Sequence, residues 1–183
     1  MKSLAGHLLI AAPRLMDPNF FRTVVLMVQH NEQGALGLVL NRPTDTTVSE
    51  AWEQIDDIPC PAEGFIHQGG PCEGPLMAVH GDDTASEIEV MPGVHFSTDR
   101  DALNKLVANT SAPMKFFVGY AGWSPGQLET ELEDGGWLVV AATAPAVFTD
   151  DPEQWTKIMK QINASSLYSA LDPKVIPPDP SMN

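Results

Sequence analysis

The most constraining feature of the sequence is a series of apolar segments of strand length near its start. They cover residues 7–12, 21–29 and 35–41, and a short polar stretch, 31–34, separates the second segment from the third. A short polar connection between two such segments predicts a β-hairpin. The second segment is apolar at both alternations over 21–28. We therefore expect both faces of that strand to be covered.

Further along the chain, short strands and helices follow one another without the regular spacing of βαβ units. We predict further strands over 65–68, 76–80, 88–90, 94–96, 114–120 and 137–142. We predict helices over 47–54, from 98 onward, from 124 to the glycines at 135–136, from 149 to about 162, and over 165–171. This pattern indicates the α+β class, with a mixed, mostly antiparallel sheet flanked by helices. So many short strands favour a bent or partly barrel-like sheet.

Two of the predicted helices carry start signals. Thr98 stands three residues before Asp101, which resembles a capping box. Ser124 is followed by Pro125, and serine as N-cap with proline at the first helical position is typical of a helix start. Ser124 also lies two residues before a glycine, as a nucleophilic serine does. The proline at position 125 favours the capping interpretation.

Length and charge limit the function classes. The chain has 183 residues, enough for one domain with its own core, which we place at 1–171, followed by a proline-rich tail at 172–183. Asp and Glu number 24 against 10 Lys and Arg, a net charge of −14. Because phosphate backbones and anionic membranes are bound through cations, we expect no direct nucleic-acid contact and no membrane partner. Two cysteines without a signal peptide predict a cytoplasmic protein with free, dispensable thiols.

The common catalytic and cofactor motifs are absent from the sequence, including the phosphate-binding loops and the zinc-protease and serine-hydrolase signatures. The best metal-ligand cluster is His67, Cys72 and His80. It lacks the tight spacing of known metal sites, and a buried thiol with two ordinary histidines explains it as well. We therefore predict no metal, no cofactor and no catalytic residue.

Two arginines lie at the ends of consecutive predicted strands. If those strands pair through the 31–34 turn, Arg22 and Arg42 fall at the same end of the sheet, next to Asn41. A guanidinium group offers a planar fork for a carboxylate or phosphate. Either acidic side chains of the chain itself or an external anion could satisfy these two cations.

A second unusual segment runs from Gly119 through Tyr120 and Trp123 to the start of a predicted helix that carries Gln127, Glu129 and Glu131. Free N–H groups at a helix start favour an anion, but these acids already complement the helix dipole. Aromatic residues here are also typical of core packing. We expect Glu129 or Glu131 to pair with one of the two arginines and so to tie the hairpin to this helix.

These segments together resemble the AlgH/YqgE family of bacterial proteins. The resemblance rests on four motifs in order, across about residues 4–163: GHLLIAAP with MDPNF and RTVV, GALGLVLNRP, GGP, and GYAGW with PGQLE. Val usually follows the GGP motif where this chain has Cys72, which indicates local variation and not a catalytic thiol. The resemblance implies an α+β fold with a bent, partly barrel-like sheet, and its usual label is transcriptional regulator.

The sequence contains no helix-turn-helix with a basic recognition helix, so we expect any regulation to be indirect. Our first hypothesis is a small non-enzymatic regulatory or binding protein whose partner is a protein or a small anionic ligand. The alternative is an enzyme or binding protein that acts on a small anion through an Arg-lined pocket. The candidate ligand-binding residues are Arg22, Asn41, Arg42, Tyr120, Trp123, Gln127 and Glu129.

Overall fold

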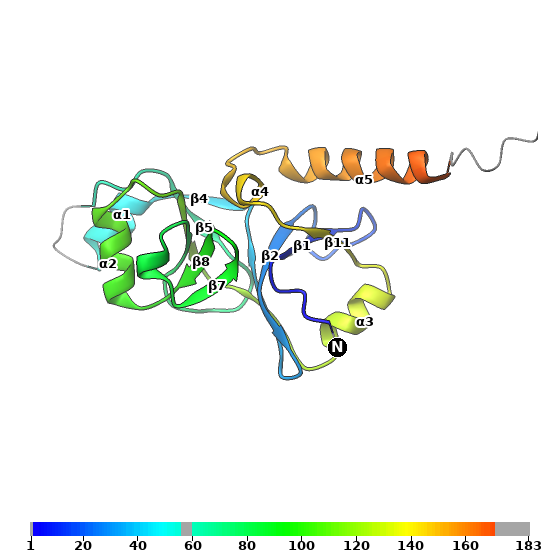
Figure 1. Cartoon of the computed structure of the whole chain (residues 1–183), viewed down its shortest axis with the longest axis horizontal. Helices are drawn as coiled ribbons and strands as arrows, with labels where there is room; N and C mark the ends of the chain where they lie inside the picture. Colours follow the sequence, from blue (N-terminus) through cyan, green and yellow to red (C-terminus); the bar gives the residue numbers. More distant parts are fainter. Residues whose placement is uncertain (1, 56–59, 171–183) are drawn as a thin grey trace, which may run out of the picture.

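The protein folds into two β-sheets that lie against each other, with helices on the outer sides (Figure 1). The computed structural model describes residues 2–55 and 60–170. The five-stranded sheet has the order β10-β3-β2-β1-β11, and every pair in it is antiparallel. Its strands are β1 (His7–Ala11), β2 (Val24–Asn31), β3 (Gly34–Val39), β10 (Ala121–Trp123) and β11 (Trp137–Ala141).

The six-stranded sheet has the order β4-β5-β9-β6-β8-β7 and is mixed, because β5 and β9 run parallel. Its strands are β4 (Pro43–Thr47), β5 (Phe65–Gln68), β6 (Met77–His80), β7 (Ile88–Met91), β8 (Val94–Ser97) and β9 (Met114–Val118). The helices are α1 (Val48–Glu53), η1 (Asp83–Ala85), α2 (Arg100–Ala108), α3 (Gln127–Glu133), α4 (Ala144–Phe148) and α5 (Gln154–Ala170).

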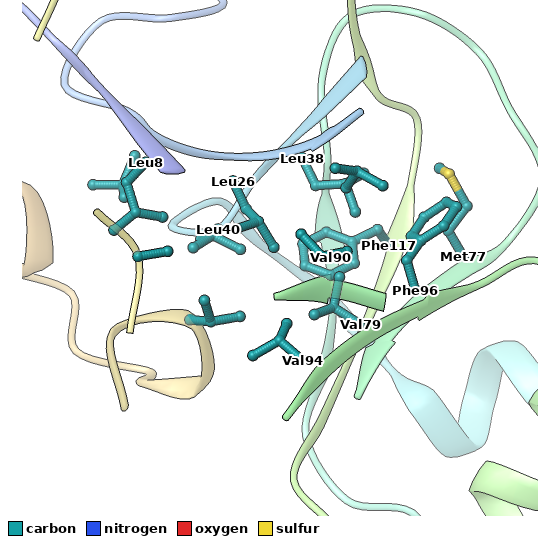
Figure 2. Close-up of a cluster of buried hydrophobic side chains, with 14 of the residues drawn as sticks. Leu8, Leu26, Leu38, Leu40, Met77, Val79, Val90, Val94, Phe96 and Phe117 are labelled. Carbon is teal, nitrogen blue, oxygen red and sulfur yellow. The ribbon is translucent and has the colours of Figure 1, made fainter. Parts of the chain in front are cut away.

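The core lies in three layers, and β2 contributes to two of them. Leu26 and Leu38 of the first sheet meet Val79 and Phe117 of the second in the central layer, which α4 and α5 close from one side (Figure 2). On the opposite face of the first sheet, Val25 and its neighbours pack against α3. The third layer lies between the second sheet and the helices α1 and α2. Both faces of β2 are covered, as predicted from its uninterrupted apolar sequence.

The α+β class and the mostly antiparallel pairing are confirmed, as is the β2–β3 hairpin. The strands are divided between two sheets, and neither closes into a barrel. The helix predicted at 47–54 is α1, whose N-cap Thr47 forms a complete capping box with Glu50. The proposed division into a domain at 1–171 and a tail at 172–183 falls at the edge of the described residues and stays a prediction.

Both predicted helix starts on Thr98 and Ser124 are wrong. The N-cap of α2 is Asp99, whose carboxylate accepts the backbone N–H groups of residues 101 and 102, while Thr98 is bonded to Glu87. The N-cap of α3 is Gly126, at φ 76°. Ser124 instead opens a turn: its carbonyl oxygen accepts the N–H of Gln127, its own N–H donates to the Gln127 side chain, and the helix begins two residues later than predicted.

The C-terminal elements also differ from expectation. Residues 144–148 form a helix, α4, that the sequence analysis did not predict, with Thr143 as its N-cap. The two helices predicted at 149–162 and 165–171 are one helix, α5, which begins at Gln154. In the described parts of the chain, no helix combines the length and apolar character needed to cross a membrane.

Two glycine-rich segments connect the sheets where they meet. The N–H of Gly69, just after β5, donates to the carbonyl oxygen of Val118, and Cys72 exchanges two backbone hydrogen bonds with Tyr120. A Cβ atom at Gly69 would lie 2.3 Å from the carbonyl oxygen of Gly119. Only glycine allows the two segments to approach this closely. The carbonyl oxygen of Gly69 also accepts the N–H of Val39 at the end of β3, and this bond joins the second sheet to the first.

Candidate functional site

A cleft of about 480 Å³ is lined by residues of the six-stranded sheet, of the connection between β3 and β4, and of the segment that joins α4 to α5. Its walls are mainly apolar. The apolar wall residues are Leu40, Pro43, Val48, Phe65, Met114, Phe116 and Pro152. Its volume falls within the range of about 300–1,000 Å³ that is typical of small-molecule sites. Phe65 is half-exposed, which makes it an apolar contact accessible from solvent.

Lys115 is the charged group within the wall of this cleft. It is the second residue of β9, a strand that is otherwise apolar. The Lys115 side chain is only 4% exposed, which is rare for a lysine. Its Nζ donates to the carbonyl oxygen of Thr149 at 2.6 Å and forms an ion pair with Asp150 at 2.9 Å. The Asp150 side chain is 80% exposed, so the pair joins a desolvated cation to a hydrated anion. These contacts tie β9 to the α4–α5 segment.

His67 lies beside Lys115 on the neighbouring strand β5. Its Nδ1 lies 3.1 Å from the carbonyl oxygen of Phe65 and its ring packs against Phe117. Burial lowers the pKa of His67, and the nearby Lys115 ammonium lowers it further. The imidazole is therefore neutral near pH 7 and adds hydrogen-bonding capacity to the cleft without adding charge.

The acidic residues of the cleft lie at its rim. Asp151 is paired with Lys157, one turn into α5, and that pair lowers the pKa of the Asp151 carboxyl. Glu63 is exposed on the opposite side. Gln154 is buried and donates to the carbonyl oxygen of Ala146, which anchors the start of α5 on α4. The rim is hydrated and acidic, while the cleft interior holds one cation.

Three of the predicted site residues lie together, as expected, at one end of the first hairpin. The Asn41 side chain bridges the strands: its Oδ1 accepts the N–H of Val24 and its Nδ2 donates to the carbonyl oxygen of Arg22. Arg42 donates to the carbonyl oxygen of Phe21, and the Arg22 guanidinium lies 5.3 Å from the ring of Trp155. Asn41 lines the cleft.

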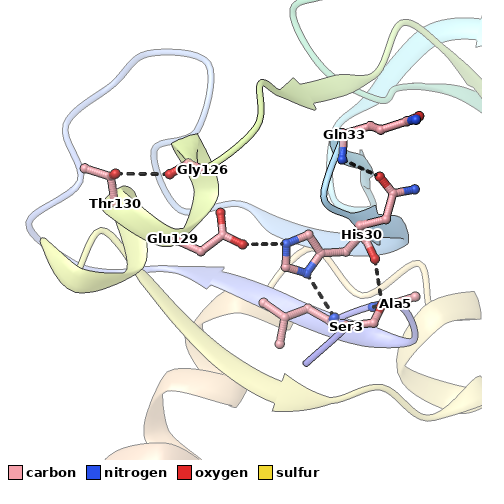
Figure 3. A network of polar contacts seen from close by, with 9 residues as sticks. Ser3, Ala5, His30, Gln33, Gly126, Glu129 and Thr130 are labelled. Atoms are coloured by element: carbon pink, nitrogen blue, oxygen red, sulfur yellow. Dashed lines mark hydrogen bonds and ion pairs between the residues drawn. The ribbon is translucent and has the colours of Figure 1, made fainter. Parts of the chain in front are cut away.

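The predicted pairing of these arginines with α3 is wrong. The Glu129 carboxylate accepts from Nε2 of His30 at 2.9 Å, while Nδ1 of the same ring accepts the N–H of Leu4 (Figure 3). His30 lies six residues beyond Val24 on β2, about 20 Å at ~3.4 Å per residue. The hairpin is tied to α3 from its other end, where His30 also holds the N-terminal segment in place.

Of the remaining predicted site residues, Trp123 and Gln127 contact Glu131 on α3. Its Oε2 accepts from the indole N–H groups of Trp123 at 3.0 Å and Trp137 at 2.8 Å, and its Oε1 accepts from Gln127 at 2.9 Å. Both indoles are buried and pack around Phe20. Tyr120 is half-buried against the central core. This cluster satisfies its own polar groups, which is the pattern of a structural support.

The predicted site residues thus do not converge on one cavity. The sequence analysis missed Lys115 and Asp150 of the cleft, and it considered His67 only as a metal ligand. One signal was available: a lysine inside the apolar strand MKFFV needs a partner when it is buried. In the part of the chain that the structure describes, no three His, Cys, Asp or Glu side chains are grouped to hold a metal ion, and Cys60 and Cys72 are free.

A family model described as AlgH-like matches residues 8–166. The chain belongs to the AlgH-like family. A UPF0301 protein of Chlorobaculum tepidum is 39% identical to it, with 97% of this chain and 95% of the relative covered. A UPF0301 protein of Myxococcus xanthus is 42% identical over 84% of this chain and 87% of the relative.

Solved structures agree with this membership. The solution structure of AlgH from Pseudomonas aeruginosa superposes with a TM-score of 0.71 at 36% identity, over 91% of this chain and 88% of that one. A crystal structure of a Corynebacterium diphtheriae protein at 24% identity, with a TM-score of 0.70, shares the fold. In this AlgH-like chain, the GGP and GYAGW segments that carried the resemblance lie directly against each other.

Proposed function

We propose that this AlgH-like protein is a non-enzymatic regulatory protein that binds a small molecule with an apolar body in the cleft beside the α4–α5 segment. The observation that carries the proposal is the cleft itself: about 480 Å³ of space with mainly apolar walls and a few fixed polar groups. Apolar walls supply affinity, and a small number of placed polar groups supplies orientation. Residues of the six-stranded sheet, of the β3–β4 connection and of the α4–α5 segment line the cleft, so a ligand there would contact all three.

The alternative of an Arg-lined anion pocket has weaker support. Both guanidinium groups are engaged outside the cleft, Arg42 with a backbone carbonyl and Arg22 with two aromatic rings. The carboxylates and amide on α3 are engaged with His30 and the indole groups. These contacts favour a structural role for the hairpin arginines and for α3.

Regulation without direct DNA contact is the second part of the proposal. Proteins bind a phosphate backbone mainly through Lys and Arg, which displace its counterions. This chain has a net charge of −14 and only 10 Lys and Arg, so it offers few such cations. A gel-shift assay at about 0.15 M salt should show no complex that survives excess competitor DNA. A discrete complex under those conditions would contradict this part and leave the cleft proposal standing.

The cleft proposal is tested by screening small aromatic and aliphatic fragments by NMR and mapping which amide signals shift. We expect the shifts to cluster on β5, β9 and the α4–α5 segment. Phe65→Ala should weaken binding with little loss of stability, because Phe65 is 50% exposed. Val139→Ala is the matched control, since Val139 is 39% exposed and lies on β11, outside the cleft lining. Equal weakening by both substitutions, or shifts elsewhere, would contradict the proposal.

A further inference from the structure

We infer that the cleft ligand carries a carboxylate or similar oxyanion, and that Lys115 binds it in place of Asp150. This inference rests on the proposed function, because it names the chemical class of the ligand for the same cleft. Lys115 is the lysine in the cleft lining, and it lies on β9 between Met114 and Phe116, which also line the cleft. Asp150 is its present anionic partner.

The two ends of the Lys115–Asp150 pair differ sharply in exposure. The Lys115 side chain is 4% exposed and the Asp150 side chain is 80% exposed. An exposed carboxylate loses little when it leaves the pair, because water solvates it at once. A desolvated ammonium left without an anion is unfavourable, so Lys115 needs a replacement. A ligand oxyanion that enters through the apolar cleft would supply it.

The ammonium group also has hydrogen-bonding capacity for a ligand. A lysine offers three N–H donors, and the Thr149 carbonyl oxygen and the Asp150 carboxylate account for two of them. A ligand oxyanion can therefore approach Lys115 before Asp150 departs. The Thr149 contact does not involve the Asp150 side chain, so it can stay in place when Asp150 departs.

The acidic residues at the rim of the cleft do not prevent an anionic ligand from binding. Glu63 and Asp150 are exposed, and Asp151 is paired with Lys157, so solvent and a local cation screen all three carboxylates. Screened charges at a surface contribute little to binding, whereas a charge in an apolar wall acts through a lower dielectric. His67, neutral for the reasons given above, adds no opposing charge.

Exchange of Asp150 for a ligand also suggests how binding would be transmitted. Asp150 lies in the segment between α4 and α5, and Lys115 lies on the second sheet. Release of Asp150 removes its ion pair with Lys115 and leaves the hydrogen bond from Lys115 to the carbonyl oxygen of Thr149. The α4–α5 segment is therefore the part of the fold whose position should respond to the ligand.

The test uses three probes with one phenylbutyl body and different head groups: 4-phenylbutyrate, its neutral amide and the corresponding amine. Dissociation constants are measured by NMR titration near pH 7 at about 0.15 M salt. We expect the carboxylate to bind about tenfold or more tightly than the amide, because hydrogen bonds between charged partners are the stronger ones. The amine should bind most weakly.

Three variants locate the preference. Lys115→Met should remove the advantage of the carboxylate while the amide still binds. Asp150→Asn should tighten carboxylate binding severalfold, because the internal competitor is gone. Asp151→Asn is the matched control, because it also removes one rim carboxylate, one that pairs with Lys157 and not with Lys115. It should change the dissociation constant of the carboxylate probe by no more than about twofold.

Each result decides between the two proposals. Equal binding of the amide or the amine, an unchanged preference in Lys115→Met, or weaker carboxylate binding in Asp150→Asn would overturn the oxyanion inference and leave the cleft as a ligand site. Failure of all three probes to shift any cleft signal would overturn the proposed function itself. If Lys115→Met does not fold, the Asp150 and Asp151 variants still decide the question.

Discussion

Replacing Glu131 should destabilise the protein more than replacing any exposed acid of the same helix. Glu131 accepts the indole N–H groups of Trp123 and Trp137, whose residues are only 5% and 3% exposed. In Glu131→Ala both donors lose their acceptor, and a buried donor left unsatisfied costs about 1–3 kcal/mol. Because Glu131 is half-exposed, water can reach part of the space, so we expect a loss of about 2–4 kcal/mol.

The assay is urea unfolding followed by tryptophan fluorescence, to which Trp123 and Trp137 contribute two of the four indoles of the chain. For a domain of this size the loss corresponds to a melting temperature lower by about 5–15 °C. Glu133→Ala is the matched control, since Glu133 lies on the same helix and is exposed. Glu131→Gln should fall between the two because it retains one carbonyl acceptor. Equal stability of Glu131→Ala and Glu133→Ala would refute the reasoning.

Three further predictions concern the rest of the fold. Gly69→Ala should strongly destabilise the protein in thermal melts, because the added Cβ would lie 2.3 Å from the carbonyl oxygen of Gly119; a wild-type melting temperature would contradict the close contact. Burial, and then the neighbouring His95, lowers the pKa of His80. As the pH falls, the unfolded chain therefore binds the proton before the folded protein does. The free energy of unfolding should be at its full value above about pH 6.5 and decrease at lower pH, and this decrease should be smaller in His80→Asn. A urea midpoint that does not change with pH would contradict this prediction. Replacing Cys60 and Cys72 by serine should shift the melting temperature by only a few degrees, and a loss of ten degrees or more would show that the thiols are needed.

The local elements were largely predictable from the sequence, since their signals are local. The β2–β3 hairpin follows from two apolar segments around a polar turn, and α1 from a threonine cap followed by apolar residues at helical spacing. Ser124 misled because a serine followed by proline is also compatible with a turn, and residues 124–127 form a turn before the helix begins. Helix α4 was missed because its five residues are too few to show a period.

The candidate site was much less predictable. Arg22 and Arg42 were correctly placed together, because a hairpin register fixes both strand ends at once. The cleft needs Lys115 of β9 and Asp150 of the α4–α5 segment in contact, and no spacing rule connects positions so far apart. The predicted partner of Glu129 was wrong for the same reason. The sequence does not give the orientation of α3, and that orientation places Glu129 beside His30 and not beside the arginines.

The most direct test of the central claim is native mass spectrometry of the protein isolated from its own cells, compared with Phe65→Ala and Val139→Ala isolated in the same way. The account predicts a small molecule with an oxyanion group and an apolar body bound to the wild-type and Val139→Ala proteins, and much less of it on Phe65→Ala. A ligand retained equally by all three proteins, or one that carries no anionic group, would contradict the account.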